Sequence, residues 1–265
     1  SSGRSRLSRS RDFDAVYRRG RSASGRHLVV YAFPRPDRDP ADPPHWVGQS
    51  LWSAAICVNT VEAGKRGLPI PQTWSDLTRP VYREAISMPN PASSGTGMLA
   101  VSAWLQLMGE ERGWAFMDAL HRNIDTYTHS GSKPCKDAAR GEVPIGISFD
   151  FRAANLKSEG APIELVVPRE GVGWDIEAAA LAAGARRRAA AEAFIAWAIS
   201  DPAMDLYARN YAVVGVTARS RPIPNLPPDL ARRLAPIDLA RAASDRDRVL
   251  AEWSRRYESK SEPGA

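Results

Sequence analysis

The chain has 265 residues, of which 43% are hydrophobic and 25% charged, the composition of an ordinary soluble globular protein. No apolar run approaches the roughly 20 residues that a membrane-spanning helix needs, which excludes an integral membrane protein of the helical class. The length is enough for one large domain or for two modest lobes.

The first 42 residues carry most of the net charge of +6, because they hold ten arginines against five aspartates. Residues 1–11 are polar and basic without an apolar core, so we expect a basic arm and no signal peptide in this numbering. A short helix is predicted over Asp12–Arg19 and a strand over His27–Phe33. Five prolines in Pro34–Pro44 then indicate a linker. This asymmetry predicts a basic segment, 1–42, joined to a second region, 43–265.

The second region alternates strands with helices. The predicted strands are Leu51–Asn59, Ala85–Met88, Val143–Phe149, Ile163–Val167 and Glu177–Ala183. The predicted helices are Thr73–Leu77, Met98–Gly109, Gly113–Ile124, Cys135–Arg140, Ala185–Ile199, Pro202–Asn210, Leu230–Ala235 and Arg246–Tyr257, with a polar loop over Tyr127–Lys133. Such alternation predicts an α/β protein with mostly parallel sheets.

Two cysteines, Cys57 and Cys135, lie far apart in the sequence and have no metal-type spacing around them. Two buried thiols are the simpler interpretation. A disulfide is the alternative, and the sequence does not decide between them.

The first candidate site is the run Ser93-Ser-Gly-Thr-Gly97, which stands between a strand and a helix. A helix N-terminus offers unpaired N–H groups and partial positive charge, and glycine allows close approach of the backbone. Ser93, Ser94, Gly95 and Thr96 therefore suit a phosphate, phosphonate, sulfate or carboxylate. The run lacks the Gly-Lys-Ser/Thr ending of a nucleotide P-loop and the spacing of a dinucleotide fingerprint. The alternative is a helix cap without a ligand.

The second candidate site, Thr128-His-Ser-Gly-Ser-Lys-Pro134, repeats the pattern of hydroxyls and glycine and precedes another predicted helix. Its candidate ligand residues are Ser130, Gly131, Ser132 and Lys133. Two such loops in one α/β protein favour anion binding over the alternative, a surface turn with one solvated lysine.

The third candidate lies in Gly171-Val-Gly-Trp-Asp-Ile-Glu177. Asp175 and Glu177 point to one face if the segment is extended, next to Trp174. Two carboxylates on one face could bind an ammonium group or form structural salt bridges.

No nucleophile motif, zinc motif or Cys/His pair of familiar spacing occurs, so we expect neither an enzyme nor a metal or cofactor site. The four histidines are scattered. His121 and His129 are interpreted as structural, since a lone histidine usually is.

From about His45 onward, the chain resembles substrate-binding proteins of ABC transporters with the type II periplasmic binding fold, particularly those assigned to 2-aminoethylphosphonate. The stretches that carry the resemblance are Trp46–Gly48, Trp52–Asn59, Met88–Gly97, Tyr127–Cys135, Gly146–Phe149, Gly173–Glu177 and Ala251–Trp253.

The resemblance implies a two-lobed fold, a zwitterionic ligand, a periplasmic location and a transporter permease as partner, without membrane insertion. The two Ser/Gly loops would meet the phosphonate, and Asp175 or Glu177 the ammonium. A relative that binds iron(III) or another anion is the alternative. Iron-binding relatives use a tandem tyrosine pair, whereas no Tyr-Tyr occurs here and the strand end reads Phe149-Asp-Phe151.

Full-length members of that family have about another hundred residues before the matching stretch, as the resemblance implies. We therefore expect an incomplete first lobe, with one lobe over about 60–175 and the remainder in the other. Residues from about 4 to 36 instead resemble the start of the bacterial ribonuclease P protein, notably Arg6–Ser22 and His27–Tyr31. Its later Arg-rich signature is missing. The expected organisation is a fusion of two truncated genes, with RNA binding by the basic segment as an alternative function.

Overall fold

The computed structural model describes residues 21–24, 29–32, 46–181, 185–210, 212–214 and 223–263. The chain divides into two compact units. The large unit comprises Trp52–Asp175, Pro222–Ile237 and Arg246–Ala265, and the small unit comprises Ser1–Leu51, Ile176–Arg221 and Asp238–Asp245. The predicted basic arm, the predicted helix Asp12–Arg19 and the proline-rich linker all lie outside the described residues.

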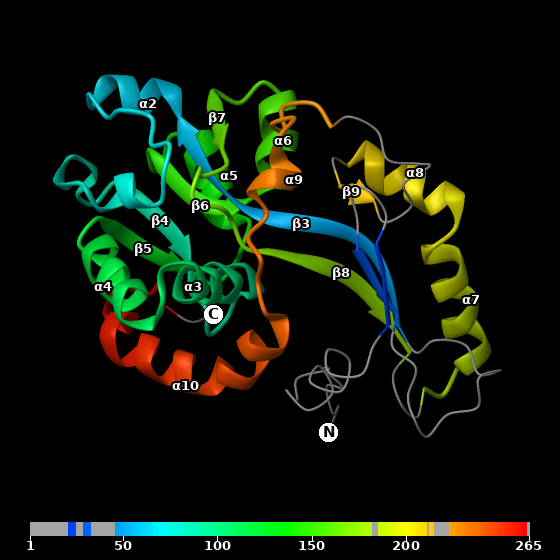
Figure 1. Cartoon of the computed structure of the whole chain (residues 1–265). Helices are drawn as coiled ribbons and strands as arrows, with labels where there is room; N and C mark the ends of the chain where they lie inside the picture. Colours follow the sequence, from blue (N-terminus) through cyan, green and yellow to red (C-terminus); the bar gives the residue numbers. More distant parts are fainter. Residues whose placement is uncertain are drawn as a thin grey trace. The chain divides into compact units, whose positions relative to one another are not determined.

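A mixed sheet with the strand order β5-β4-β6-β3-β7 forms the core of the large unit (Figure 1). Its strands are β3 (Trp46–Asn59), β4 (Ile86–Pro89), β5 (Ile124–Thr128), β6 (Ile145–Phe149) and β7 (Ile163–Val166). β4 runs parallel to β5 and β6, whereas β3 runs antiparallel to β6 and β7. The α/β class is as predicted, but the prediction of a mostly parallel sheet holds only for its β5-β4-β6 half.

β3 lies between β6 and β7 in this sheet. Residues 54–58 are fully buried, in agreement with the apolar run that predicts this strand. Cys57 lies in this run and forms a disulfide with Cys135, 78 residues later. The interpretation of the cysteines as free thiols is therefore wrong, because the fold brings the helix α5, which contains Cys135, next to the distant strand β3.

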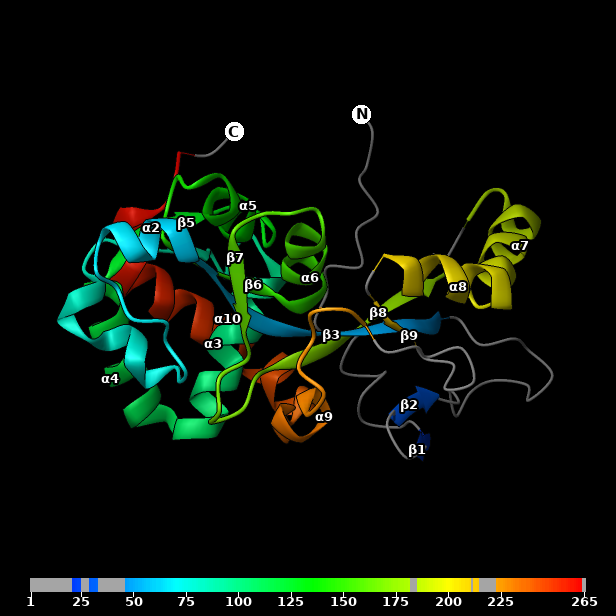
Figure 2. The same cartoon turned by 90° about the horizontal axis from the view of Figure 1, so that it is seen from above.

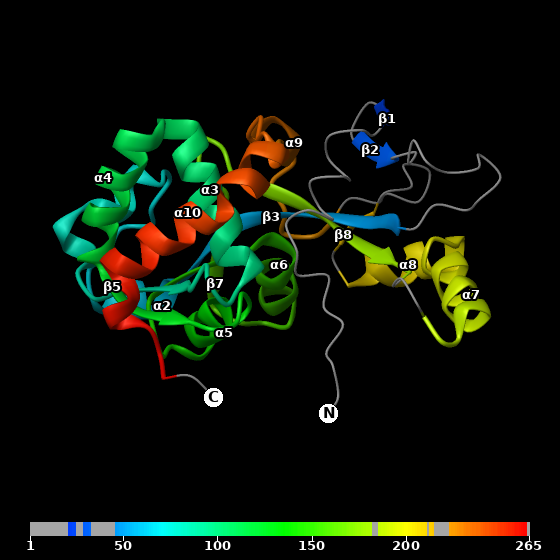
Figure 3. The same cartoon turned by 90° about the horizontal axis from the view of Figure 1, so that it is seen from below.

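Helices cover both faces of the sheet. Figures 2 and 3 show α3 and α4 on one face and α5 and α6 on the other. The bounds in the large unit are α2 (Thr60–Lys65), α3 (Gly95–Met108), α4 (Glu110–His121), α5 (Lys133–Arg140), α6 (Asp150–Ser158) and α9 (Leu230–Arg233), with short 3-10 turns at Ser75–Thr78, Pro80–Tyr82 and Glu258–Lys260. The helices α2 and α6 have no counterpart among the predicted elements.

The largest error of the sequence-based prediction concerns β5. The predicted helix Gly113–Ile124 ends at His121, and Ile124–Thr128 is a strand rather than the end of a helix and the start of a loop. Asn123 explains the break, because its buried side-chain amide donates hydrogen bonds to the carbonyl oxygens of Leu77 and Arg79 at 2.7 and 2.8 Å. The helix therefore ends before Asn123, because the side chain of Asn123 is bound to the segment of Leu77 and Arg79, although the sequence periodicity would continue the helix.

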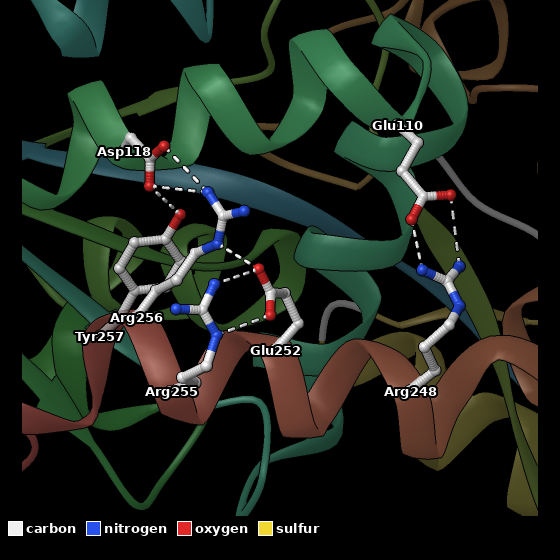
Figure 4. Close-up of polar contacts among 7 residues, drawn as sticks. All are labelled: Glu110, Asp118, Arg248, Glu252, Arg255, Arg256 and Tyr257. Carbon is white, nitrogen blue, oxygen red and sulfur yellow. Dashed lines mark hydrogen bonds and ion pairs between the residues drawn. The ribbon is translucent and has the colours of Figure 1, made fainter.

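The helix α10 (Leu239–Tyr257) packs against α4 through an ion-pair network (Figure 4). The guanidinium group of Arg256 lies between the carboxylates of Asp118 and Glu252, at 2.9 and 2.6 Å. It also stacks over the ring of Trp114 at 5.0 Å. Exposed ion pairs contribute little, so the buried side chains of Val249, Trp253 and Tyr257 supply most of the stabilisation of this helix. The last turn of α10 thereby sets the path of the residues after Tyr257.

The small unit contains the antiparallel strands β1 (Arg21–Ser24) and β2 (Val29–Ala32), the latter within the strand predicted over His27–Phe33. It also contains most of β8 (Trp174–Ala180), together with β9 (Val213–Val214), α7 (Arg188–Ala198) and α8 (Asp201–Arg209). Two polar contacts organise it: the amide of Gln49 donates to the Tyr207 hydroxyl at 3.0 Å, and that hydroxyl donates to the carbonyl of Ala198 at 3.1 Å.

Candidate ligand-binding site

Two Ser/Gly loops follow adjacent parallel strands of the large unit. The carboxyl ends of parallel strands share one edge of a sheet, and ligands of open α/β sheets bind outside that edge. We define loop A as Asn90–Gly97, which follows β4, and loop B as Thr128–Lys133, at the end of β5. The backbone N–H of Asn90 donates to the carbonyl of Thr128 at 2.8 Å, so the loops leave the sheet side by side.

Hydrogen bonds of Asn90 determine the conformation of loop A. The side-chain oxygen of Asn90 accepts from the N–H of Ala92 at 2.7 Å, and its carbonyl accepts from the N–H of Ser94 at 2.9 Å. Ser94 is the N-cap of α3, yet its side chain makes no capping hydrogen bond. The first turn of a 14-residue helix thus lacks a side-chain cap and can offer N–H groups to an anion.

Loop B is held by a hydrogen bond from β6, the strand on the other side of β4. The buried hydroxyl of Ser148 donates to the carbonyl of Gly131 at 2.6 Å. Lys133 begins α5, and its ammonium group lies 2.7 Å from the carboxylate of Asp137. The hydrogen bond to Asp137 raises the pKa of Lys133, so this lysine stays charged throughout the physiological range.

Gly131 is the point where the two loops touch. A methyl group in place of its hydrogen would lie 2.2 Å from the hydroxyl oxygen of Thr96 and 3.1 Å from that of Ser94. In loop B itself, the hydroxyls of Ser130 and Ser132 lie 3.2 Å apart. The structure therefore packs Gly131, between the two serines of loop B, against the hydroxyls of Ser94 and Thr96 in loop A.

His129 joins loop A to loop B through a contact that the sequence did not indicate. Its Nδ1 lies 2.8 Å from the hydroxyl of Ser93, and its Nε2 lies 3.0 Å from the carbonyl oxygen of Glu262. A carbonyl oxygen can only accept, so Nε2 carries a proton, and in a neutral ring Nδ1 accepts from Ser93. The interpretation of His129 as a lone structural histidine misses its place between the two loops.

The third predicted segment is divided between the two units. Trp174 and Asp175 belong to the large unit, where the indole N–H of Trp174 donates to the carbonyl of Ala235 at 2.8 Å. Glu177 belongs to the small unit and lies 3.5 Å from the hydroxyl of Ser50. The assignment of these two carboxylates to an ammonium group stays a prediction.

Asp150 is a further charged group at the same sheet edge, where β6 passes into α6. Its carboxylate is 1% exposed and accepts hydrogen bonds from the N–H and hydroxyl of Ser53 at 3.1 and 2.8 Å, and from the N–H of Phe151 at 2.7 Å. Burial raises the pKa of Asp150 to about 6, against the opposing effect of these hydrogen bonds.

The raised pKa makes the contribution of Asp150 to stability depend on pH. The folded chain holds this proton more tightly than the unfolded chain, so stability is lost as the pH rises from about 4 to above 6. We expect the difference in unfolding free energy, wild type minus Asp150→Asn, to grow by about 2–3 kcal/mol between pH 7 and pH 4. Urea unfolding at several pH values measures it, with the exposed Glu159→Gln as control; a difference independent of pH would contradict the expectation.

Within the described ranges, no group of three or more His, Cys, Asp or Glu side chains is placed to hold a metal ion. None of the helices in that part of the chain is long and apolar enough to cross a bilayer. The groups at loops A and B that can donate to a small oxyanion are hydroxyls, backbone N–H groups and the ammonium group of Lys133.

Comparison with known proteins agrees with this architecture. The profile of the family described as bacterial extracellular solute-binding protein matches residues 32–232, and the ribonuclease P profile matches residues 2–56. An uncharacterized protein of Haemophilus influenzae is 39% identical over 150 residues, which are 56% of this chain and 43% of that protein. The phosphoglycerate transport regulatory protein PgtC of Salmonella typhimurium is 35% identical over 71 residues, which are 27% of this chain and 18% of PgtC. The chain thus spans less than half the length of either relative.

Solved structures share the fold. The periplasmic binding protein AfuA of Actinobacillus pleuropneumoniae, with fructose-6-phosphate bound, is 32% identical with a TM-score of 0.74, over 83% of this chain and 71% of AfuA. The periplasmic binding protein P5PA is 25% identical, also with a TM-score of 0.74, over 81% of this chain and 69% of P5PA. Iron-bound HitA of Pseudomonas aeruginosa, at 18% identity and a TM-score of 0.63 over 79% of this chain and 69% of HitA, shares the fold alone. The fold is that of type II periplasmic binding proteins, and the chain belongs to the bacterial extracellular solute-binding protein family.

Proposed function

We propose that the chain is the solute-binding component of an ABC transporter in the periplasm and that it binds a small zwitterionic phosphonate such as 2-aminoethylphosphonate. The observation that carries the proposal is the contact of loop A with loop B at Gly131, which gathers hydroxyls from both around two helix N-termini. A phosphonate has three oxygens and needs several donors at once, which such a cluster supplies.

The relatives support an anionic group on the ligand. AfuA is described with fructose-6-phosphate bound, and PgtC is described as a phosphoglycerate transport regulatory protein. Both compounds carry a phosphoryl group, which presents the same oxygens as a phosphonate.

A disulfide inside the large unit also suits an oxidising compartment such as the periplasm.

Iron(III) is the weaker candidate. The strand end that would carry a tyrosine pair reads Phe149-Asp-Phe151, and Asp150 there is enclosed by hydrogen bonds from the protein. Iron-bound HitA is similar only at the level of the fold.

Isothermal titration calorimetry with 2-aminoethylphosphonate, phosphate and sulfate tests the proposal. We expect heat of binding with the first, and weaker binding of the other two. A well-folded sample that releases no heat with any of the three would refute it.

A variant in loop B links binding to the cluster. We expect Gly131→Ala to weaken binding by about tenfold or more, because displacing the loops at a cost of about 1.4 kcal/mol already changes a dissociation constant tenfold. The added methyl group would overlap Thr96. Gly64→Ala in α2 is the matched control, since a methyl group there meets nothing within 4 Å. Equal affinity of both variants would place the ligand elsewhere.

A further inference from the structure

The residues after α10 reach the two loops of the candidate site. Ser261 bridges to Tyr127 of β5 in parallel register, and the N–H of Glu262 donates to the carbonyl of Tyr127 at 2.9 Å. The ammonium group of Lys260 donates to the carbonyl of His121 at 2.9 Å. These contacts carry the chain along the edge of β5 to loop B.

Glu262 then touches loop B with both its backbone and its side chain. One carboxylate oxygen accepts from the N–H of His129 at 2.6 Å, and the other lies 3.7 Å from the ammonium group of Lys133. The carbonyl of Glu262 accepts from Nε2 of His129, whose Nδ1 meets Ser93 of loop A. Glu262 therefore contacts loop B directly and is linked through the ring of His129 to the hydroxyl of Ser93 in loop A.

The charge at the loops follows from these contacts. Lys133 is accompanied by the carboxylates of Asp137 and Glu262, and a third carboxylate, that of Glu258, lies 3.4 Å from the amide nitrogen of Asn90 in loop A. A ligand with two negative charges and no positive one would be repelled by such a set, because like charges brought together in a partly buried place cost free energy.

We infer that Glu262 is a specificity-determining residue that favours ligands with an ammonium group beside the anionic group and disfavours anions that lack one. The inference rests on the proposed function and deepens it, since it names the carboxylate in the large unit that attracts the ammonium group of the ligand. The donors of loops A and B bind the oxyanion, and the negative charge of Glu262 selects among oxyanions by their net charge.

The test compares two ligands that differ only by the amino group, 2-aminoethylphosphonate and ethylphosphonate, on wild type and Glu262→Gln. Glutamine keeps an acceptor for the N–H of His129 and removes only the charge. In wild type we expect 2-aminoethylphosphonate to bind about tenfold or more tightly than ethylphosphonate, and in Glu262→Gln we expect this ratio to fall by about tenfold, which corresponds to 1.4 kcal/mol. Glu111→Gln, an exposed change in α4, is the control and should leave the ratio unchanged.

The outcomes separate the two proposals. A ratio that is the same in wild type and Glu262→Gln, while both ligands still bind, overturns the inference and leaves the proposed function standing. An equal loss of affinity for both ligands assigns Glu262 a merely structural role in holding His129 and also overturns the inference. No binding of either ligand to folded wild type refutes the proposed function and the inference together.

Discussion

Replacing Cys57 and Cys135 together by alanine is expected to lower the free energy of unfolding by about 4 kcal/mol. The disulfide closes a loop of 78 residues, and the loop-entropy relation assigns about 4 kcal/mol to the closure of a loop of that length. The bond also ties the first turn of α5, which begins with Lys133, to the strand β3. Its loss should therefore loosen loop B as well as the fold.

Urea unfolding with and without a reducing agent measures this effect. The wild-type midpoint should fall on reduction, while that of the double variant should not move. Because both sulfur atoms are fully buried, complete reduction should need partial unfolding first, so the reducing agent is best added in denaturant before refolding. A double variant within about 1 kcal/mol of wild type would show that the folded core, rather than the cross-link, supplies the stability.

The two glycines of loop A should respond in opposite ways to alanine. In Gly97→Ala the methyl group would lie 2.4 Å from the carbonyl oxygen of Pro89 and 2.8 Å from the nitrogen of Pro91, both backbone atoms that cannot rotate away. We expect a loss of about 2–3 kcal/mol, typical of forced overpacking. In Gly95→Ala the methyl group meets nothing within 4 Å, and alanine in the first turn of α3 should be neutral or stabilising by up to about 1 kcal/mol.

The pair is its own control, since both residues lie in the first turn of the same helix and both changes add one methyl group. Chemical unfolding of the two variants beside wild type gives the comparison. A similar loss in both would mean that the loop needs the flexibility of glycine in general. The close approach of α3 to the end of β4 would then not be the reason for Gly97.

Local sequence patterns predicted the parts of the fold that depend on neighbours in the chain. The strand β3 ends at Asn59 as predicted but begins earlier, at Trp46, and the predicted helix Met98–Gly109 is found at Gly95–Met108. The strand β5 was missed because Asn123, which stops the helix before it, is held by residues more than 40 positions earlier. Periodicity contains no information on such a contact.

The candidate site was predictable in its loops but not in its surroundings. Hydroxyls and glycines between a strand and a helix are visible in the sequence, and the fold supplies their meeting at Gly131. The contact of His129 with Glu262 joins residues 133 positions apart, so no local motif announces it. The hydrogen-bond donors of the site lie close together in the sequence, whereas the carboxylate near them comes from a residue far away in the sequence.

The bridge between Tyr127 and Ser261 also bears on the tendency of the protein to aggregate. β5 is the last strand in the order β5-β4-β6-β3-β7, and an open sheet edge is a template for pairing with another chain. The segment after α10 lies along that edge, and the side-chain amine of Lys260 occupies the carbonyls of His121 and Ile124. A shortened chain ending at Tyr257 would bare these groups, and intermolecular strand pairing, seen as aggregation that grows with protein concentration, is the consequence to expect.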